Sequence, residues 1–375
     1  MGGLRIGVNA LYLIPGGVGG TEIYLRHLLE ALGEIDTRDE FLVFTNAETG
    51  RDLGPARANF TLAPSRVKAS FRPARILWEQ SGLPLGAVRR RLDVLFNPGF
   101  TAPLWSPCPM VTVFHDLQHR RLPEHFRWFD LPFWRFLLWG SAHRSTLLLA
   151  VSESTRADLL REYRLPESRV RVVPEGVDPA FFGLAANPDQ RDPYLLVVST
   201  LHPHKNLELL LRAFADFRRR RPEYRLVVAG LRGFHAEHLE RVRRDLRLEQ
   251  AVEFTGWIPR SRLYRLYERA SAFLYPSTFE GFGLPVLEAM AAGIPVACSD
   301  IEPLASHAGR GALRFDPHDR SAIAEAMLRL TSDEDLRAEL AREGPRRAAE
   351  FSWHRAASLT LQAIRDAAGA SASRR

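Results

Sequence analysis

Short apolar runs rich in β-branched residues alternate with segments of helical period along the whole chain. Continuous apolar strands that alternate with helices indicate parallel sheets covered on both faces, so the pattern predicts an α/β fold. The strands predicted from these runs are Arg5–Asn9, Phe41–Thr45, Asp93–Asn97, Val111–Asp116, Thr146–Ser152 and Val170–Pro174 in the first half, and Tyr194–Ser199, Arg225–Gly230, Val252–Thr255, Ala272–Pro276 and Ile294–Cys298 in the second.

Helices are predicted between these strands. The clearest follows Asn206 and carries its apolar residues on one face. That face consists of Leu207, Leu210, Leu211, Phe214 and Phe217. Further helices are predicted near Thr21–Gly33, Arg75–Gly82 and Glu153–Tyr163.

A boundary between two α/β halves is predicted near residue 180. The stretch Pro174-Glu175-Gly176-Val177-Asp178 is punctuated by proline and glycine, and the polar segment 185–193 follows it. We therefore expect one domain over residues 1–180 and a second over residues 181–352. Ligands of open α/β sheets bind beyond the carboxyl ends of the strands, so we expect the two sheets to face a central cleft.

Composition excludes several other classes of protein. The chain has 375 residues, of which 46% are hydrophobic and 25% charged, which is typical of a globular protein with two domains. Its two cysteines exclude a disulfide framework. The longest apolar stretch, 131–151, is interrupted by Arg135, His143 and Arg144, and the N-terminus carries no signal-peptide pattern. The sequence therefore predicts a cytoplasmic protein.

The net charge of +7 is a moderate basic excess spread along the chain. It suits a phosphate-bearing partner or an anionic membrane surface, and it does not require nucleic acid. Only Lys68 and Lys205 are lysines among the 51 basic residues. A lysine on this arginine background suggests that a compact ammonium is needed, most clearly for Lys205.

Two loops after predicted strands of the first half could carry chemistry. Residues 15–22 are rich in glycine, including Gly19 and Gly20, and their amides could approach an anion at a helix N-terminus. Their spacing fits neither a dinucleotide fingerprint nor a P-loop, and a turn shaped only by backbone geometry explains them equally well. His115 ends a parallel strand and should face the cleft. A lone histidine is nevertheless more often structural, held by a backbone carbonyl.

Two loops of the second half give a stronger signal. Lys205 directly precedes the amphipathic helix, where the helix dipole disfavours a cation unless an anion lies between them. Residues 277–290 pass from a strand through a glycine-bearing loop into a helix, so the amides of Gly283 and Leu284 could bind an anion. Glu280 lies in this loop, and Glu288 is expected in the first helical turn. A favourable helix-terminus charge would explain Glu288 alone, but not the pair.

Taken in order, these motifs resemble those of one known family, the retaining glycosyltransferases of group 1, which have the GT-B fold of two Rossmann-like domains. The motifs are Gly19-Gly20-Thr21-Glu22, His115-Asp116, Val151-Ser152, Pro174 to Asp178, Lys205-Asn206, Glu280 with Glu288, and Ser352-Trp353. The resemblance covers nearly the whole chain. It implies an acceptor domain, then a donor domain, and then a C-terminal helix over residues 353–375 that crosses back to pack on the first domain.

The resemblance also implies roles for single residues of the second domain. Lys205 would hold the diphosphate of a nucleoside-diphosphate sugar, helped by the amides of Gly283 and Leu284. Glu288 would bind the ribose hydroxyls, and Glu280 would bind the hydroxyls of the transferred sugar.

Further roles fall on residues of both domains. His115 would contact the transferred sugar and stabilise positive charge at its anomeric carbon, and Ile258 would present backbone groups to the base. Gly19 and Gly20 complete the expected donor set together with Thr200. Thr200 departs from the family, which often has a second cation at this position. Some mannosyltransferases of the family also have threonine there.

The implied reaction keeps the anomeric configuration by front-face attack and needs no cofactor. Lys205 and helix termini could neutralise the leaving diphosphate, so no metal site is expected. Asp333-Glu334-Asp335 is the only Asp-x-Asp segment, and we interpret it as charge at a helix N-terminus. The favoured donor is GDP-mannose, on the basis of Thr200 and the His-Pro-His-Lys-Asn loop.

The expected acceptor is a saccharide or a lipid-linked saccharide. Residues 71–78 and 120–135 are both aromatic and basic, and they could seat a glycan or rest on an anionic membrane. Packing of most of these aromatic residues in the core is the favoured alternative. Another nucleotide-sugar enzyme of this architecture, an epimerase or phosphorylase, remains open, as does a non-catalytic protein that binds sugar nucleotides.

Overall fold

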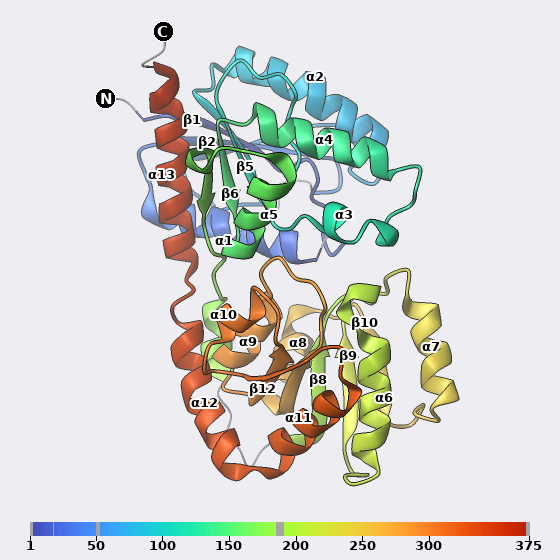
Figure 1. The fold of residues 1–375 in the computed structure, drawn as a ribbon. Helices are drawn as coiled ribbons and strands as arrows, with labels where there is room; N and C mark the ends of the chain where they lie inside the picture. The colour runs from blue at the N-terminus through green and yellow to red at the C-terminus, as the bar shows by residue number, and fades with distance from the viewer. Residues whose placement is uncertain (1–2, 18, 50–52, 185–190, 373–375) are drawn as a thin grey trace. The chain divides into compact units, whose positions relative to one another are not determined.

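The computed structural model describes residues 3–17, 19–49, 53–184 and 191–372 (Figure 1). The chain divides into two compact units. Unit 1 runs to Gly176 and resumes at Trp353, and unit 2 is Val177–Ser352. The division between the units falls four residues before the predicted boundary at residue 180.

Unit 1 is built on a sheet of seven parallel strands in the order β3-β2-β1-β4-β5-β6-β7. Its strands are β1 Arg5–Asn9, β2 Glu40–Thr45, β3 Phe60–Pro64, β4 Val94–Asn97, β5 Met110–Phe114, β6 Leu147–Ala150 and β7 Val170–Val172. Its helices are α1 Gly20–Ile35, α2 Arg72–Arg90, α3 Gln118–Arg121, α4 Leu131–Arg144, α5 Glu153–Tyr163 and α13 Trp353–Ala372. The strand order reverses between β1 and β4, which is where open α/β sheets bind ligands.

Unit 2 is built on six parallel strands in the order β10-β9-β8-β11-β12-β13. Its strands are β8 Asp192–Val198, β9 Arg225–Ala229, β10 Val252–Gly256, β11 Ala270–Tyr275, β12 Val296–Ser299 and β13 Leu313–Phe315. Its α-helices are α6 Leu207–Arg218, α7 Ala236–Asp245, α8 Arg260–Arg269, α9 Leu284–Ala291, α10 Leu304–Ala308, α11 Arg320–Ser332 and α12 Glu334–Ala348. Here the order reverses between β8 and β11.

The structure confirms every predicted strand to within two residues at each end. The predicted apolar face of α6 is buried in the core of unit 2. Two edge strands, β3 and β13, were missed because an edge strand is only partly buried and needs no continuous apolar run. Helix α2 continues beyond the predicted end at Gly82, through Pro84, because Leu83 and Ala87 are buried in a core cluster of unit 1.

Candidate active site

The predicted lysine and glutamate of unit 2 meet where its strand order reverses. Lys205 ends a 3-10 turn after β8, and Glu280 follows β11. The Lys205 Nζ atom lies 2.6 Å from Glu280 Oε1 and 3.0 Å from the Tyr275 hydroxyl oxygen. The two charged side chains are 14% and 9% exposed, so this is a largely buried ion pair at the ligand-binding edge of the sheet.

The ion pair keeps Lys205 charged. Burial alone would lower the pKa of Lys205, but the charge of Glu280 and the hydrogen bonds to Glu280 and Tyr275 outweigh burial and raise it above its ordinary value. Burial and then the charge of Glu280 raise the pKa of Tyr275, so its hydroxyl stays protonated. The site therefore presents an ammonium beside a carboxylate.

The two loops that carry this pair are also joined through their backbones. The Thr278 amide and hydroxyl both donate to the His204 carbonyl, at 2.8 and 3.2 Å. Gly283 directly precedes α9 with a φ of 89°, and a Cβ atom there would lie 2.2 Å from Leu304 Cδ2, so only glycine fits. No side chain caps α9, and the Leu284 amide is among the first N–H groups of that helix.

Glu288 lies in the second turn of α9, not in the first turn as expected, because the helix begins at Leu284. It is 4% exposed and accepts a 2.9 Å hydrogen bond from the Tyr267 hydroxyl. The rings of Tyr267, Phe273 and Tyr275 stack in series, with centroids 5.7 and 6.1 Å apart. An aromatic ladder thus links Glu288 to the hydroxyl that binds Lys205.

The other expected donor residues of unit 2 lie on the same edge of its sheet. Thr200 follows β8, and its carbonyl accepts a 2.8 Å hydrogen bond from the His202 amide. Ile258 follows β10, two strands from β8, and is half-buried beside the exposed Trp257. Within the described part of the chain, the side-chain hydrogen bonds of Lys205 go to Glu280 and Tyr275, and not to Thr200 or Ile258.

His115 lies directly after β5 in unit 1 and is 8% exposed. Its Nε2 atom lies 2.9 Å from the Pro98 carbonyl oxygen, and its Nδ1 atom lies 3.1 Å from Glu175 Oε1. Because a carbonyl only accepts, Nε2 carries a proton, and Nδ1 faces a carboxylate. The imidazole is therefore held from both sides, by the expected carbonyl and by an acid that the sequence did not associate with it.

Glu175 is the residue that sequence reasoning missed. It is 6% exposed and follows β7, whereas the motif carries asparagine at this position in the family that the chain resembles. No spacing rule connects it with a histidine 60 positions earlier, although a charged residue at a motif position is itself a signal of a special contact.

The glycine loop of unit 1 is anchored by a carboxylate. Glu22 Oε2 accepts a 2.8 Å hydrogen bond from the Gly16 amide, and Oε1 binds Arg26 at 2.9 Å. Gly19 precedes α1 with a φ of 62°, and a Cβ atom on Gly19 or Gly20 would have no heavy atom within 4 Å. The backbone conformation of Gly19 thus favours glycine, and the space beside its Cα atom is open. Val18 lies outside the described residues.

The last helix reaches the same histidine through two aromatic rings. Helix α13 packs on α1, and its first residue, Trp353, stacks on His27 and meets the edge of Tyr24 at 5.8 Å. Tyr24 in turn makes an edge contact with His115 at 4.7 Å. A contact series from Trp353 to Glu175 therefore runs through Tyr24 and His115.

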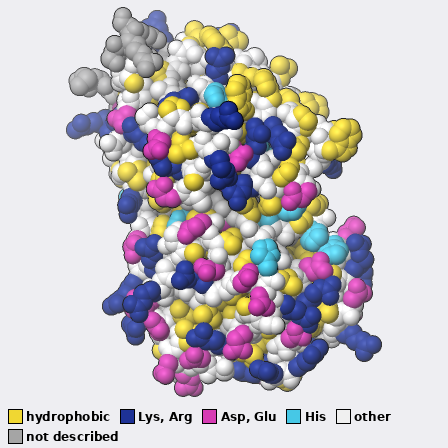
Figure 2. Space-filling model, in the orientation of Figure 1, with side chains coloured by type: hydrophobic (Ala, Val, Ile, Leu, Met, Phe, Trp, Pro, Cys, Tyr) yellow, Lys and Arg dark blue, Asp and Glu magenta, His cyan; other side chains and the backbone are white. Residues whose placement is uncertain are grey.

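Most of the aromatic residues in the two basic stretches are exposed, so the expectation that they pack in the core was wrong. They lie on α2, on α4 and on the segment before α4, and together with nearby aliphatic residues they form what we call the α2–α4 face (Figures 1 and 2). This face comprises Phe71, Leu77, Leu85, Val88, Trp128, Phe129, Phe133, Phe136 and Trp139. Arg72 lies over the Trp134 ring at 5.8 Å and so connects the two helices.

The acidic segment 333–335 is confirmed as a helix N-terminus. Asp333 precedes α12, and its carboxylate accepts a 3.0 Å hydrogen bond from the Leu336 amide.

Among the described residues, a group able to hold a metal ion is instead found at Glu208, His235 and His238. In the described part of the chain, no helix combines the length and hydrophobicity needed to cross a bilayer.

Comparison with known families gives the class of protein that this fold and these motifs define. The model for glycosyl transferases group 1 matches residues 185–347, and the model for glycosyltransferase family 4 matches residues 18–181. The chain belongs to the group-1 glycosyltransferases, and the predicted GT-B class of fold is confirmed.

Individual relatives and solved structures agree with this. The chain is 31% identical to O-antigen chain mannosyltransferase B of Escherichia coli, over 68% of this chain and 70% of the relative. It is 30% identical to D-inositol 3-phosphate glycosyltransferase of Pseudarthrobacter chlorophenolicus, over 96% of this chain and 94% of the relative. Sucrose-phosphate synthase from Thermosynechococcus elongatus has the same fold at 20% identity, with a TM-score of 0.81 over 98% of this chain and all of that one. Anabaena HepE, solved with UDP and glucose, is 18% identical to this chain. Its TM-score is 0.74, over 96% of this chain and 99% of HepE.

Proposed function

We propose that this glycosyltransferase moves a hexose, with mannose favoured, from a nucleoside-diphosphate sugar to a saccharide or lipid-linked acceptor with retention of configuration. The observation that carries the proposal is the buried Lys205–Glu280 pair at the strand-order reversal of unit 2. Similarity to a mannosyltransferase supports mannose, and GDP-mannose is the favoured donor.

In the proposed ground state, the donor diphosphate binds Lys205 and the amides at the start of α9. The ammonium is already charged and held by Glu280 and Tyr275, so little reorganisation precedes binding. Glu280 keeps one carboxylate oxygen toward Lys205, and its other oxygen binds sugar hydroxyls. Glu288 binds the ribose, at the far end of the aromatic ladder from Lys205.

In the proposed reaction, the bond from the anomeric carbon to the diphosphate oxygen breaks, and the acceptor oxygen bonds to the same face of that carbon. The acceptor proton passes to the departing phosphate oxygen, so protons and charge balance without a separate base. His115 is proposed to stabilise the positive charge on the sugar. Its ring is aimed by the Pro98 carbonyl and the Glu175 carboxylate.

Metal independence is part of the proposal, because a lysine and a helix N-terminus supply the positive potential that a divalent ion would otherwise give. Transfer by the purified chain should therefore persist in excess EDTA. Complete loss in EDTA, with recovery on adding Mg²⁺ or Mn²⁺, would contradict this part of the proposal and leave the rest standing.

The donor is identified by thermal unfolding of the full chain with GDP, UDP or ADP, because a ligand that binds only the native state raises the melting temperature. A rise with GDP alone supports GDP-mannose, and a rise with UDP alone moves the donor to UDP-sugars. A chain stabilised by none of the three does not fit a nucleotide-sugar enzyme. NMR of the transferred product then gives the anomeric configuration, while isomerised donor or free sugar phosphate would indicate an epimerase or phosphorylase.

A lipid-linked acceptor is supported by the α2–α4 face. The one acid in α2 and α4, Glu79, is fully buried, so the exposed charges of both helices are arginines. Exposed aromatic rings interspersed with cations suit the interface of an anionic bilayer. We propose that this face rests on the membrane that holds the acceptor.

Flotation with vesicles tests the membrane contact. The chain should bind vesicles rich in phosphatidylglycerol at low salt, and binding should weaken as salt screens the arginines. The triple variant Trp128→Ser, Phe136→Ser, Trp139→Ser should lose most of this binding, whereas Phe234→Ser, which alters a side chain 66% exposed in unit 2, should keep it. Equal flotation of both variants, or none by the wild type, would contradict the proposal.

A further inference from the structure

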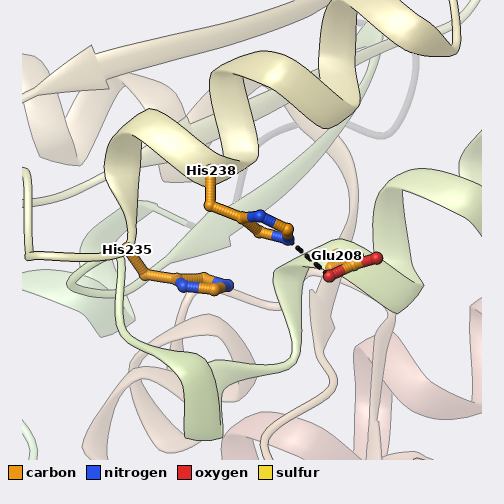
Figure 3. Close-up of side chains that lie close together, drawn as sticks. All are labelled: Glu208, His235 and His238. Atoms are coloured by element: carbon orange, nitrogen blue, oxygen red, sulfur yellow. Dashed lines mark hydrogen bonds and ion pairs between the residues drawn. The ribbon is translucent and has the colours of Figure 1, made fainter.

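A second cluster of chemically active side chains lies on one surface of unit 2, where α6 and α7 pack together (Figure 3). Glu208 is in the first turn of α6, His235 precedes α7 and His238 is in its first turn. In Figure 3 the three side chains point toward one another, with Glu208 reaching across from the neighbouring helix. We propose that these three residues bind a divalent transition-metal ion, with Zn²⁺ as the representative ligand.

The spacing of the donor atoms suits such an ion. His238 Nε2 lies 2.6 Å from Glu208 Oε2, and one donor atom from each residue lies within 4.8 Å of the others. A tetrahedral zinc ion with bonds of about 2.0–2.1 Å holds its donors roughly 3.3 Å apart. That separation lies between the two observed limits, so small side-chain movements are enough to enclose the ion.

The chemistry of the donors is that of a borderline metal ion. Imidazole nitrogens suit zinc, copper and nickel, and a carboxylate completes donor sets of two histidines and one glutamate. Magnesium and calcium prefer oxygen donors throughout, so they should bind weakly here. Three protein ligands leave a coordination position for water, which the partial exposure of Glu208 and His238 allows.

Surrounding groups orient the carboxylate. Arg212, one turn along α6, donates to Glu208 Oε1 at 2.9 Å, so Oε2 is the oxygen directed to the histidines. The nearby guanidinium also repels a cation, so we expect micromolar rather than nanomolar affinity.

The ion would join two helices that also pack together through buried apolar residues. Glu208 follows the Lys205 turn by three residues, and the ion would fix the beginning of α6 against the beginning of α7. Nothing in the proposed transfer reaction uses these three residues, so metal binding and glycosyl transfer can fail independently.

Calorimetric titration of the full, tag-free chain with ZnCl₂ tests the site. We expect one ion per chain, with affinity lowered at least about tenfold by each of Glu208→Gln, His235→Ala and His238→Ala. The matched control is His354→Ala, because His354 pairs with Glu34 in unit 1 and should leave zinc affinity unchanged. Equal affinity in the wild type and in the triple variant of the three ligands would overturn the proposal, as would the absence of binding by the wild type.

Two further measurements guard against misfolded variants and non-specific binding. Zn²⁺ should raise the melting temperature of the wild type and not that of the triple variant, and EDTA should reverse the rise. Co²⁺ should give the intense visible absorption of a four- or five-coordinate ion, and each ligand substitution should remove it. Weak six-coordinate absorption in the folded wild type would contradict an enclosed site.

Discussion

Each unit places one buried acid–base pair beyond the carboxyl ends of its strands, and the two pairs differ in kind. In unit 2 an ammonium meets Glu280, and a neighbouring tyrosine hydroxyl accepts from the same nitrogen. In unit 1 an imidazole lies between Glu175 and the Pro98 carbonyl. The lysine presents an ammonium charge, whereas the histidine presents a ring oriented by two hydrogen-bond partners.

This difference matches the work proposed for each pair. A diphosphate leaving group needs a positive charge before, during and after bond cleavage, which a lysine provides. Positive charge on the sugar exists only near the transition state, so an oriented ring next to a carboxylate suits unit 1. The comparison predicts that the two pairs respond differently to the same kind of substitution.

The largest effect should come from breaking the pair in unit 2. Lys205→Met should lower kcat at least about 100-fold, because it removes the cation facing the leaving group. It also strands Glu280 in a buried position, which should cost about 3 kcal/mol of unfolding free energy. Transfer rates at saturating donor and urea unfolding measure the two losses.

The double variant Lys205→Met, Glu280→Gln should recover part of that stability and none of the activity. Arg310→Met is the matched control, because the Arg310–Glu339 pair is exposed and should contribute about 0.5 kcal/mol or less. A Lys205→Met chain that transfers sugar at the wild-type rate would contradict the assignment.

A smaller effect is expected for the anion of unit 1. Glu175→Gln keeps an oxygen that can accept from His115 but removes its charge, so kcat should fall roughly tenfold with little change in the KM for the donor. Because Glu175 is proposed to act through the ring, adding Glu175→Gln to His115→Ala should lower kcat no further.

Additive losses in that double variant would show that Glu175 acts independently of His115. Glu153→Gln is a suitable control, because Glu153 is an exposed acid of unit 1 whose carboxylate lies 4.0 Å from Arg156. Its kcat should equal that of the wild type.

The smallest effect concerns stability in acid. His119 is buried, and its Nε2 atom lies 2.7 Å from the Tyr163 hydroxyl oxygen. Burial, followed by the charges of Arg120 and Arg135, lowers the pKa of His119 to about 4. The unfolded histidine has a pKa of about 6.5, so its contribution to stability is complete above that pH and declines as pH falls toward 4.

His119→Gln should flatten this decline, since glutamine can hydrogen-bond to Tyr163 and does not titrate. Urea unfolding of the wild type and the variant at several pH values between 7 and 4.5 measures it, with His354→Gln as the exposed control. If the slope is the same in wild type and His119→Gln, another group causes the acid sensitivity of unit 1.

The sequence predicts the position of one of the two pairs better than that of the other. Lys205 and Glu280 each stand in a loop after an apolar strand, and parallel strands bring such loops to one edge, so their approach followed from pattern alone. The contact of Glu175 with His115 did not, because it depends on where β7 lies in the sheet relative to β5, two strands away. Strand order is set by packing of the whole sheet and has no local signal.

The same reasoning explains the other differences. The core face of α6 was readable because burial imposes a helical period on it. The aromatic residues of the α2–α4 face were expected in the core because hydrophobicity alone does not distinguish a core from an exposed functional surface. The cluster of Glu208, His235 and His238 joins two helices, and only the packing of α6 on α7 brings its members together.

The position of α13 has a consequence for the order of folding during synthesis. The strands of unit 1 leave the ribosome first, yet the helix that covers Tyr24 and His27 is translated only after the whole of unit 2. N-terminal domains commonly fold before later ones are made. Here the flank of α1 that carries Tyr24 and His27 lacks its covering helix until α13 has been made.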